Sequence, residues 1–249
     1  KTMSAVSKVK VPLTTSPRFQ KEAAEIALQM SQFSVDELER LLRVNAKIAV
    51  ENYKRYQAFH AEATPELPAL LAYTGIVFKR LNPKDFSAED FGYAQEHLRL
   101  TSFCYGLLRP LDVIRAYRLE GDVVLPELGN QTLFSYWRSR LTDTFIEDIR
   151  SAGGILCNLA SDEMKSLFDW KRVESEVRVV TPEFHVWKNG KLATIVVYTK
   201  MSRGEMTRFI LKNKIGNPEE LKGFSWEGFE FDESLSDERK LVFINGMGE

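Results

Sequence analysis

Basic side chains are concentrated in one short stretch of the sequence, between Tyr198 and Lys214. The stretch holds five cationic residues and one acid, Glu205. The cationic residues are Lys200, Arg203, Arg208, Lys212 and Lys214. Clustered lysines and arginines neutralise phosphates, and the affinity of such contacts falls with salt because counterions are released. The stretch therefore predicts an anion-binding surface, while a helix face that is merely solvated remains the alternative.

Two further arginines lie in a segment that is rich in turn-forming residues. Arg109 follows Gly106 and precedes Pro110, and Arg118 lies a few positions beyond them. Guanidinium groups can donate two parallel hydrogen bonds to a phosphate or a carboxylate. Each arginine also has an acid two or three positions further along the chain, so an internal ion pair that orients a turn is an equally good explanation. The sequence leaves both explanations open.

Polar residues follow directly after a short apolar run at positions 155–159. These residues are Asn158, Ser161, Asp162 and Glu163. In mixed folds ligands commonly bind at strand ends, which makes the group a candidate polar pocket. The alternative is a helix start, with Ser161 or Asp162 as the N-cap and Glu163 in the first turn. Together with Arg118 and Lys200, the group is the basis for a second functional hypothesis, an enzyme of unassigned reaction.

Searches for familiar catalytic motifs find none in the chain. The glycine-rich phosphate loops, the G-x-S-x-G motif and the H-E-x-x-H motif are all absent. The three histidines, His60, His97 and His185, are far apart in the sequence. We therefore expect no metal site and no cofactor, and the catalytic residues of any enzyme activity stay unknown.

The overall composition is that of an ordinary globular protein. The 249 residues carry a formal net charge of −1, which removes the simplest signature of a nucleic-acid-binding chain. The neutral total combines the basic segment 198–214 with an acidic one, because residues 219–238 contain eight acids and one cation, Lys222. Its carboxylates are expected to form a solvated run, which gives little support to direct binding of iron.

Cysteine content and hydropathy indicate where the protein works. The only two cysteines, Cys104 and Cys157, are too few for a disulfide scaffold and fit a reducing compartment. No uncharged run approaches the roughly 20 residues that a membrane-spanning helix needs. We therefore expect a cytoplasmic protein without membrane contact.

Hydrophobic periodicity predicts helices in the first half of the chain and a change of period later. Helices are expected over 18–32, from the capping box at Ser34 to about residue 59, from Ser87 onward, over 132–150 and over 198–214. Strands are expected over 155–159, 228–232 and 241–244. Asn189-Gly190 predicts a β-hairpin between 183–188 and 191–198. The expected fold is α+β: a single mixed domain over 1–249, with several helices packed on a short-stranded sheet.

These segments together resemble the YaaA family of bacterial peroxide stress proteins. The resemblance is carried by Tyr105–Asp112, by Tyr117–Glu120, by Asn158–Glu163, by the late motif from Tyr198 to Phe209, and by Leu241–Phe243. The family usually opens with a short apolar strand that leads into serine-proline-alanine-lysine-threonine, of which only Lys1-Thr2-Met3 is present here. The resemblance thus implies that the family's first strand is missing from this sequence.

The resemblance also implies a function. It predicts a cytoplasmic protein that lowers unincorporated intracellular iron during peroxide stress, so that iron-driven DNA damage is limited, and that binds duplex DNA through a basic cleft. It further implies a family-specific fold with a helix-hairpin-helix-like element, for which the 106–108 segment is the best local candidate, although a typical hairpin has two glycines and this one has Gly106 alone. On this hypothesis Arg109, Lys200, Arg203 and Arg208 contact phosphate, with Arg118 and Lys212 as further anion-binding candidates.

Overall fold

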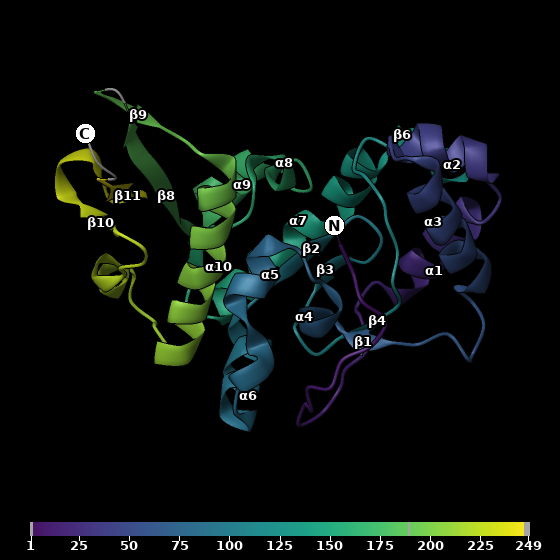
Figure 1. The fold of residues 1–249 in the computed structure, drawn as a ribbon, viewed down its shortest axis with the longest axis horizontal. Coiled ribbons are helices and arrows are strands. Elements are labelled where there is room, and N and C mark those ends of the chain that lie inside the picture. The colour runs from purple at the N-terminus through teal and green to yellow at the C-terminus, as the bar shows by residue number, and fades with distance from the viewer. Residues whose placement is uncertain (1, 189, 247–249) are drawn as a thin grey trace.

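The computed structural model describes residues 2–188 and 190–246, and it mixes helices with short sheets (Figure 1). The predicted α+β class is confirmed. Helices of the first half are α1 (Gln20–Met30), α2 (Val35–Leu42), α3 (Ala46–Ala58), α4 (Ala69–Ala72), α5 (Ile76–Leu81) and α6 (Ala88–His97). Helices of the second half are α7 (Leu133–Ser151), α8 (Asp162–Lys165), α9 (Trp170–Glu176) and α10 (Val196–Asn213). Short 3-10 turns are η1 (Pro83–Asp85), η2 (Pro126–Leu128), η3 (Pro218–Gly223) and η4 (Glu233–Leu235).

Local sequence signals account for several helix starts. The Ser34 hydroxyl accepts a hydrogen bond from the amide of Glu37, whose carboxylate accepts one from the Ser34 amide, so the predicted capping box is confirmed. The same reciprocal arrangement opens α6, between Ser87 and Asp90. These bonds satisfy amides that would otherwise lack partners in the first turn. Capping chemistry alone was therefore sufficient to place both helix starts.

Three small antiparallel sheets lie among the helices of the first half and just beyond. They pair β1 (Leu67–Pro68) with β4 (Val113–Ile114), β2 (Leu100–Ser102) with β3 (Gly106–Leu108), and β5 (Val124–Leu125) with β6 (Gln131–Thr132). Strand β3 is fully buried, and Gly106 has a φ of +68° with no room for a side chain against Trp137. The 106–108 segment is therefore a buried strand whose amides do not face solvent. The helix-hairpin-helix-like element stays a prediction, and this segment does not supply it.

The larger sheet is built from the last third of the chain. Its order is β10-β11-β8-β7, with β9 also paired to β8. The strands are β7 (Ile155–Cys157), β8 (Arg178–Lys188), β9 (Lys191–Ala193), β10 (Phe229–Asp232) and β11 (Lys240–Asn245). Strands β7 and β11 run parallel to β8, whereas β9 and β10 are antiparallel to their partners. All the strands predicted for this region are present.

The predicted hairpin is confirmed by the pairing of β8 with β9. Lys188 lies opposite Lys191, which leaves a two-residue turn, and Gly190 has a φ of +69° as such a turn requires. Asn189 itself lies outside the described residues. The second strand is shorter than predicted, because pairing ends at Ala193 and residues 196–198 begin α10 instead. β-branched residues favour strands, but here the helix that continues from them overrides that preference.

Helix α10 joins the sheet to the helical part of the molecule. One face carries Met206, which packs in the cluster with Phe184 and Phe243 of the sheet. The other face packs along α5, where a Cβ atom at Gly204 would come within 2.3 Å of the Val77 carbonyl oxygen. Glycine at this position lets the two backbones touch. Packing against the sheet and α5 therefore covers much of α10, while Val196, Val197 and Lys200 in its N-terminal half stay exposed.

Two larger apolar cores sit on either side of this junction. The first unites α1–α3, α7 and the small sheets around side chains such as Ile26, Leu38 and Trp137. The second lies between α10 and the larger sheet. In Figure 1 the larger sheet and α10 form one lobe and α1–α3 the other, with α5, α7 and α8 between them. That the whole chain forms a single domain remains a prediction.

Candidate functional site

The cations in the C-terminal half of α10 are held by carboxylates from η1 and α6. The three ion pairs are Arg208 with Asp85 at 2.5 Å, Lys212 with Asp90 at 2.8 Å, and Lys214, just beyond the helix, with Glu89 at 3.0 Å. Arg208 also donates to the backbone carbonyl oxygens of Leu81 and Asn82. Two of the predicted anion-binding residues, Arg208 and Lys212, are thus already neutralised by the chain itself.

These basic partners lower the pKa values of the Asp85 and Asp90 carboxyl groups. Hydrogen bonds from Arg208 hold the pKa of Asp85 below its ordinary value. Burial opposes ionisation of Asp90, but hydrogen bonds from Lys212 and from Ser87 outweigh it and lower the pKa of that carboxyl. Both acids are therefore ionised at neutral pH. The C-terminal half of α10 is fixed electrostatically as well as by packing.

The cations in the N-terminal half of α10 have no such partners. Lys200 is exposed, and within residues 2–188 and 190–246 neither it nor Arg203 takes part in an ion pair. The Nε atom of Arg203 is buried and has no hydrogen-bond acceptor in the part of the chain that the structure describes. Burial lowers the pKa of the Arg203 guanidinium, and the charge of Asp162 offsets this only in part. A desolvated cation without a bound carboxylate is an energetically poor arrangement that an anion would improve.

Arg109 and Arg118 lie elsewhere in the fold. The Arg109 guanidinium is 3.2 Å from the carboxylate of Asp112, which is almost completely buried and also accepts a hydrogen bond from Thr15. Arg118 is 3.2 Å from Glu120. Across the described part of the chain, no hydrogen bond or ion pair links either arginine to α10. Both explanations given by the sequence therefore remain compatible with these positions, because each guanidinium is paired and still partly exposed.

The polar group after β7 is mostly occupied by local structure. Asn158 is buried, and its side-chain oxygen accepts a hydrogen bond from the Ala160 amide. Ser161 is the N-cap residue of α8, although its hydroxyl makes no capping bond. Asp162 pairs with Lys165 at 2.8 Å, and both Asp162 and Glu163 are exposed. The alternative that the sequence offered, a helix start at Ser161, therefore matches the structure. Asp162 is the member of the group whose pKa is lowered, chiefly by its hydrogen bond with Lys165 and in addition by the charge of Arg203.

Cavities do not unite the candidate pocket residues. Arg118 lines a cavity of about 10 Å³ with Phe103, Tyr117 and Leu119. Such a space holds one water molecule. A larger recess of about 290 Å³ is lined by Ser135, Arg138, Ser139, Thr142, Asp143, Asp169 and Arg172, none of which the sequence singled out. The enzyme hypothesis therefore gains no shared cavity from these two spaces.

The cysteines and the acidic side chains offer little redox or metal chemistry. Burial raises the pKa of the Cys157 thiol to about 12, and the pKa of Cys104 is raised for the same reason. The thiolate, which is the form that reacts with peroxide, is therefore scarce at neutral pH. Over the described ranges, no group of three or more His, Cys, Asp or Glu side chains is arranged to hold a metal ion.

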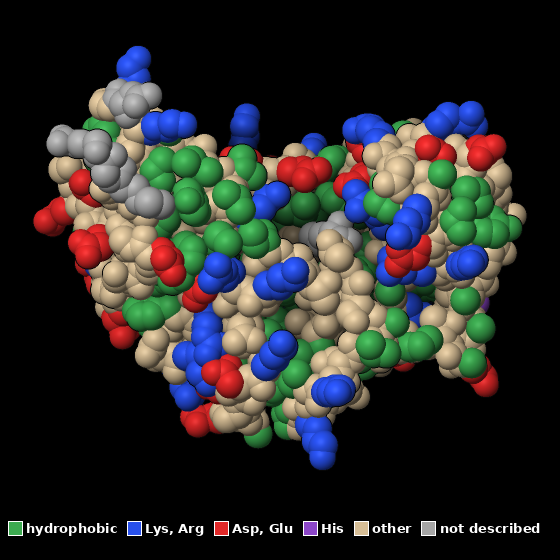
Figure 2. Space-filling view, in the orientation of Figure 1, with side chains coloured by type: hydrophobic (Ala, Val, Ile, Leu, Met, Phe, Trp, Pro, Cys, Tyr) green, Lys and Arg blue, Asp and Glu red, His purple; other side chains and the backbone are tan. Residues whose placement is uncertain are grey.

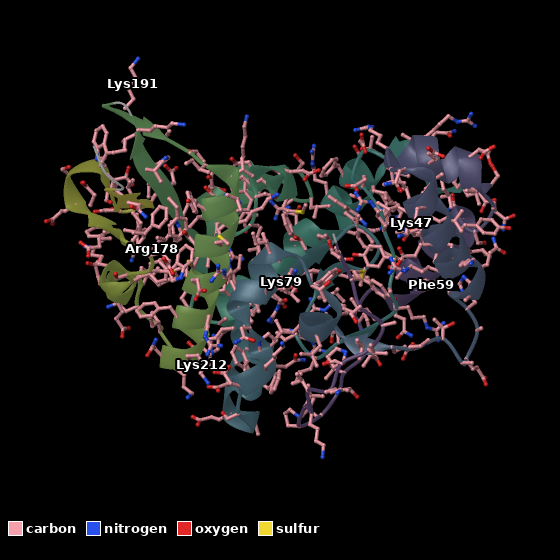
Figure 3. The ribbon with its side chains drawn as sticks, viewed as in Figure 1. Lys47, Phe59, Lys79, Arg178, Lys191 and Lys212 are labelled. Carbon is pink, nitrogen blue, oxygen red and sulfur yellow. The ribbon has the colours of Figure 1, made fainter. Side chains whose placement is uncertain are left out.

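The surface of the molecule is hollowed between its two lobes (Figure 2). Figure 2 shows the upper surface hollowed between the lobe that contains α10 and the lobe that contains α1–α3, with Lys and Arg side chains on both sides of the hollow. Lys79, labelled in Figure 3, extends from α5 near the middle of the molecule, whereas Lys212 lies at the far end of α10. Lys79 is exposed, and no ion pair involves it among the described residues. Sequence reasoning missed it because it stands outside every charged cluster.

None of the described helices combines the length and the apolar character that crossing a bilayer demands. This finding concerns residues 2–188 and 190–246.

Comparison with known proteins gives relatives from several bacteria. A UPF0246 protein of Bacteroides thetaiotaomicron is 99% identical over 249 residues, which are all of this chain and 97% of the relative. A UPF0246 protein of Porphyromonas gingivalis is 53% identical over 93% of this chain and 91% of its own length. The UPF0246 protein of Crocosphaera subtropica is 37% identical, with 94% and 92% covered. The family model described as peroxide stress protein YaaA matches residues 1–235, so the chain belongs to that family.

Proposed function

We propose that this peroxide stress protein binds duplex DNA, largely without regard to sequence, through the N-terminal half of α10. On this proposal it acts in the cytoplasm and limits iron-driven damage to DNA during peroxide stress. Phosphates of the backbone supply the anions, and Lys200 with Arg203 supply the central cations. Contacts with phosphates carry no sequence information, which fits a protective role over any stretch of DNA.

One observation carries the proposal: Lys200 and Arg203 keep their charge unpaired while neighbouring cations do not. Among the described residues, the cations further along α10 are bound to Asp85 and Asp90. Arg203 is in addition partly desolvated, so its pKa is lowered by burial. A phosphate oxygen near this guanidinium would offset that cost.

The remaining predicted contacts take different roles in the proposal. Arg208 and Lys212 hold α10 in position, because they form ion pairs with Asp85 and Asp90. Arg109 and Arg118 are proposed as peripheral phosphate contacts, since each has an exposed portion and further N–H donors beyond its single ion pair. Lys79 on α5 joins Lys200 and Arg203 as a third unpaired cation.

Acidic side chains of the C-terminal lobe set a constraint on orientation. They gather mainly along its outer edge, away from the hollow (Figure 2). DNA that lies along the hollow avoids most of their repulsion.

The salt dependence of duplex binding tests this proposal. Wild-type protein should bind a short duplex with an affinity that falls steeply with salt, because each phosphate contact contributes about 0.9 to the logarithmic slope. The double variant Lys200→Ala with Arg203→Ala should bind more weakly and lower that slope by about 2. Fluorescence anisotropy across a salt series measures both quantities.

The matched control changes the paired cations of the same helix. Arg208→Ala with Lys212→Ala removes the same number of charges, but the slope should change by well under 1 because those charges are already neutralised. Circular dichroism confirms that each variant is folded. Absence of duplex binding by the wild-type protein, or equal effects of the two double variants, would contradict the proposal.

A further inference from the structure

The face of the larger sheet that looks away from α10 carries an ordered set of polar side chains at its hairpin end. Side chains along a strand alternate between the two faces. Phe184 and Val186 of β8 point into the core that the sheet shares with α10. Glu183, His185 and Trp187 therefore lie on the opposite face. This half of β8 is not used by the proposed DNA contact.

His185 is held between a carboxylate and a hydroxyl. Its Nε2 atom is 3.1 Å from the Glu183 carboxylate on the same strand, and its Nδ1 atom is 3.1 Å from the hydroxyl oxygen of Thr194, just after β9. The histidine is half-buried at 23% exposure, and the Glu183 side chain is 40% exposed. Thr194 is exposed. The hydroxyl is thus open to a reagent while its partner ring is fixed.

The partners decide the tautomer of the neutral ring. An ionised carboxylate can only accept hydrogen bonds, so the proton must be on Nε2, where Glu183 accepts it. The Nδ1 atom is then a bare acceptor, and the Thr194 hydroxyl donates its hydrogen to it. A hydroxyl bonded to a base that is itself oriented by a third group is the arrangement of an activated nucleophile.

Other threonines of this region are bonded differently. The Thr199 hydroxyl donates to the Ile195 carbonyl oxygen, and that of Thr207 donates to the Arg203 carbonyl oxygen at 2.7 Å. A backbone carbonyl cannot take up a proton at neutral pH, so these hydroxyls are not activated. Thr199 therefore provides a matched control for Thr194 within the same segment.

An apolar platform lies next to the polar set. Trp187 and Leu192 are directly opposed across the hairpin, at 46% and 38% exposure. Because Trp187 is two residues from His185, and Leu192 two residues from Thr194, both lie beside the activated hydroxyl on one face. A flat aromatic side chain with an aliphatic neighbour suits a short apolar acyl chain.

We propose that Thr194 is an acyl acceptor, with His185 as its general base and Glu183 as the positioning residue. The donor class is an activated acyl compound, such as an acyl phosphate or a thioester, that carries a short apolar acyl group. The Thr194 oxygen attacks the carbonyl carbon, an O–C bond forms, and the bond to the leaving group breaks. The hydroxyl proton passes to Nδ1 of His185 and from there to water, and the product is an ester on Thr194.

An activated ester provides the test. The folded, full-length chain is incubated with p-nitrophenyl butyrate, and the tryptic peptide 192–200 is analysed by mass spectrometry for a butyryl group that hydroxylamine removes. Hydroxylamine cleaves esters and leaves the amides that lysines form, so background acylation of lysine is separated. Tandem spectra distinguish Thr194 from Tyr198 and Thr199.

The wild type should form the ester on Thr194, and His185→Gln should slow its formation about 100-fold, the typical contribution of a general base. Thr194→Val should abolish it, whereas Thr199→Val should not change it. Glu183→Gln should slow the reaction, and Glu183→Asp should restore part of it, which a purely structural role of the carboxylate would not produce.

The role of Trp187 and Leu192 is tested separately, by the preference between acyl esters of different length. Trp187→Ala with Leu192→Ala should lower the preference for butyryl over acetyl esters about tenfold, because binding of the longer chain is lost. Far-UV circular dichroism checks folding, and these side chains are exposed, so the fold should survive. Absence of an ester on Thr194 in the wild type, or an unchanged rate in His185→Gln, would overturn the proposal whatever the outcome of the DNA experiment.

Discussion

The two halves of α10 carry similar numbers of basic side chains, but they differ in whether those side chains form ion pairs. The N-terminal half presents Lys200 and Arg203, which have no ion pair within the described residues, and the C-terminal half presents Arg208 and Lys212, which are bound to Asp85 and Asp90. In sequence the two halves look like one basic helix. The comparison teaches that a count of lysines and arginines measures the charge that is available only after the partners are known.

The largest expected effect comes from breaking the contact that holds the two halves in place. Gly204→Val would put side-chain atoms against the Val77 carbonyl oxygen, where a Cβ atom alone already approaches to 2.3 Å. Backbone atoms cannot move aside easily, so we expect a loss of about 3 kcal/mol or more in the free energy of unfolding. Urea denaturation measures this loss.

Gly216→Ala is the control for that substitution, because nothing lies within 4 Å of the added atom. Its effect should stay within about 1 kcal/mol. Equal stability of the two variants would mean that α5 and α10 do not pack as closely as described.

An intermediate effect is expected when the acids of the C-terminal half are removed. The pKa values of Asp85 and Asp90 are lower in the folded protein than in the unfolded chain. The stability that they contribute is therefore present above about pH 4, the ordinary aspartate value, and is lost as the pH falls through the folded values. Wild-type stability should fall more steeply with acid than that of Asp85→Asn with Asp90→Asn.

Thermal unfolding between about pH 2.5 and 7 measures this difference. The pair of Asp85, whose side chain is 54% exposed, should contribute at most about 1 kcal/mol, and the pair of Asp90, whose side chain is 8% exposed, should contribute the larger share. Asp36→Asn is the control, because this side chain is exposed and takes part in no ion pair among the described residues. Parallel pH curves for the wild type and the double variant would argue against the electrostatic fixing of this half.

The smallest expected effect, and the one that separates function from stability, is Arg203→Met. Removing a partly buried cation that has no carboxylate bound to it should leave the free energy of unfolding unchanged or raise it by about 1 kcal/mol. The same variant should weaken duplex binding. Differential scanning fluorimetry and anisotropy on one preparation give both values, and a strong loss of stability would show that Arg203 has a structural role instead.

Local signals in the sequence predicted much of the fold. The capping boxes at Ser34 and Ser87 predicted two helix starts, and the dipeptide Asn189-Gly190 predicted the hairpin. These signals depend on contacts between residues that are close along the chain. The predicted end of the second hairpin strand was wrong. Residues 196–198 favour a strand locally, but they form the first turn of α10 because the following turns of that helix pack against the rest of the molecule.

The candidate site was predicted only in part. The residue types of α10 were identified, yet the Asp85 carboxylate that neutralises Arg208 lies 123 positions away in the sequence. The link between Arg203 and Asp162, and the unpaired Lys79, also depend on segments that meet only after folding. The hydrogen bond between Thr194 and His185 was not predicted, because the two residues are nine positions apart and belong to no known motif.

By itself, the sequence determined the class of fold, the positions of the longer helices and of the strands in the larger sheet, and the family, because these follow from periodicity, capping and motifs within short windows. The tertiary structure alone decided which cations are free. Long-range packing chooses the neighbours of each charged group, and the free energy of a charge depends on those neighbours and on its access to water. The difference between the two halves of α10 is therefore a property of the folded chain.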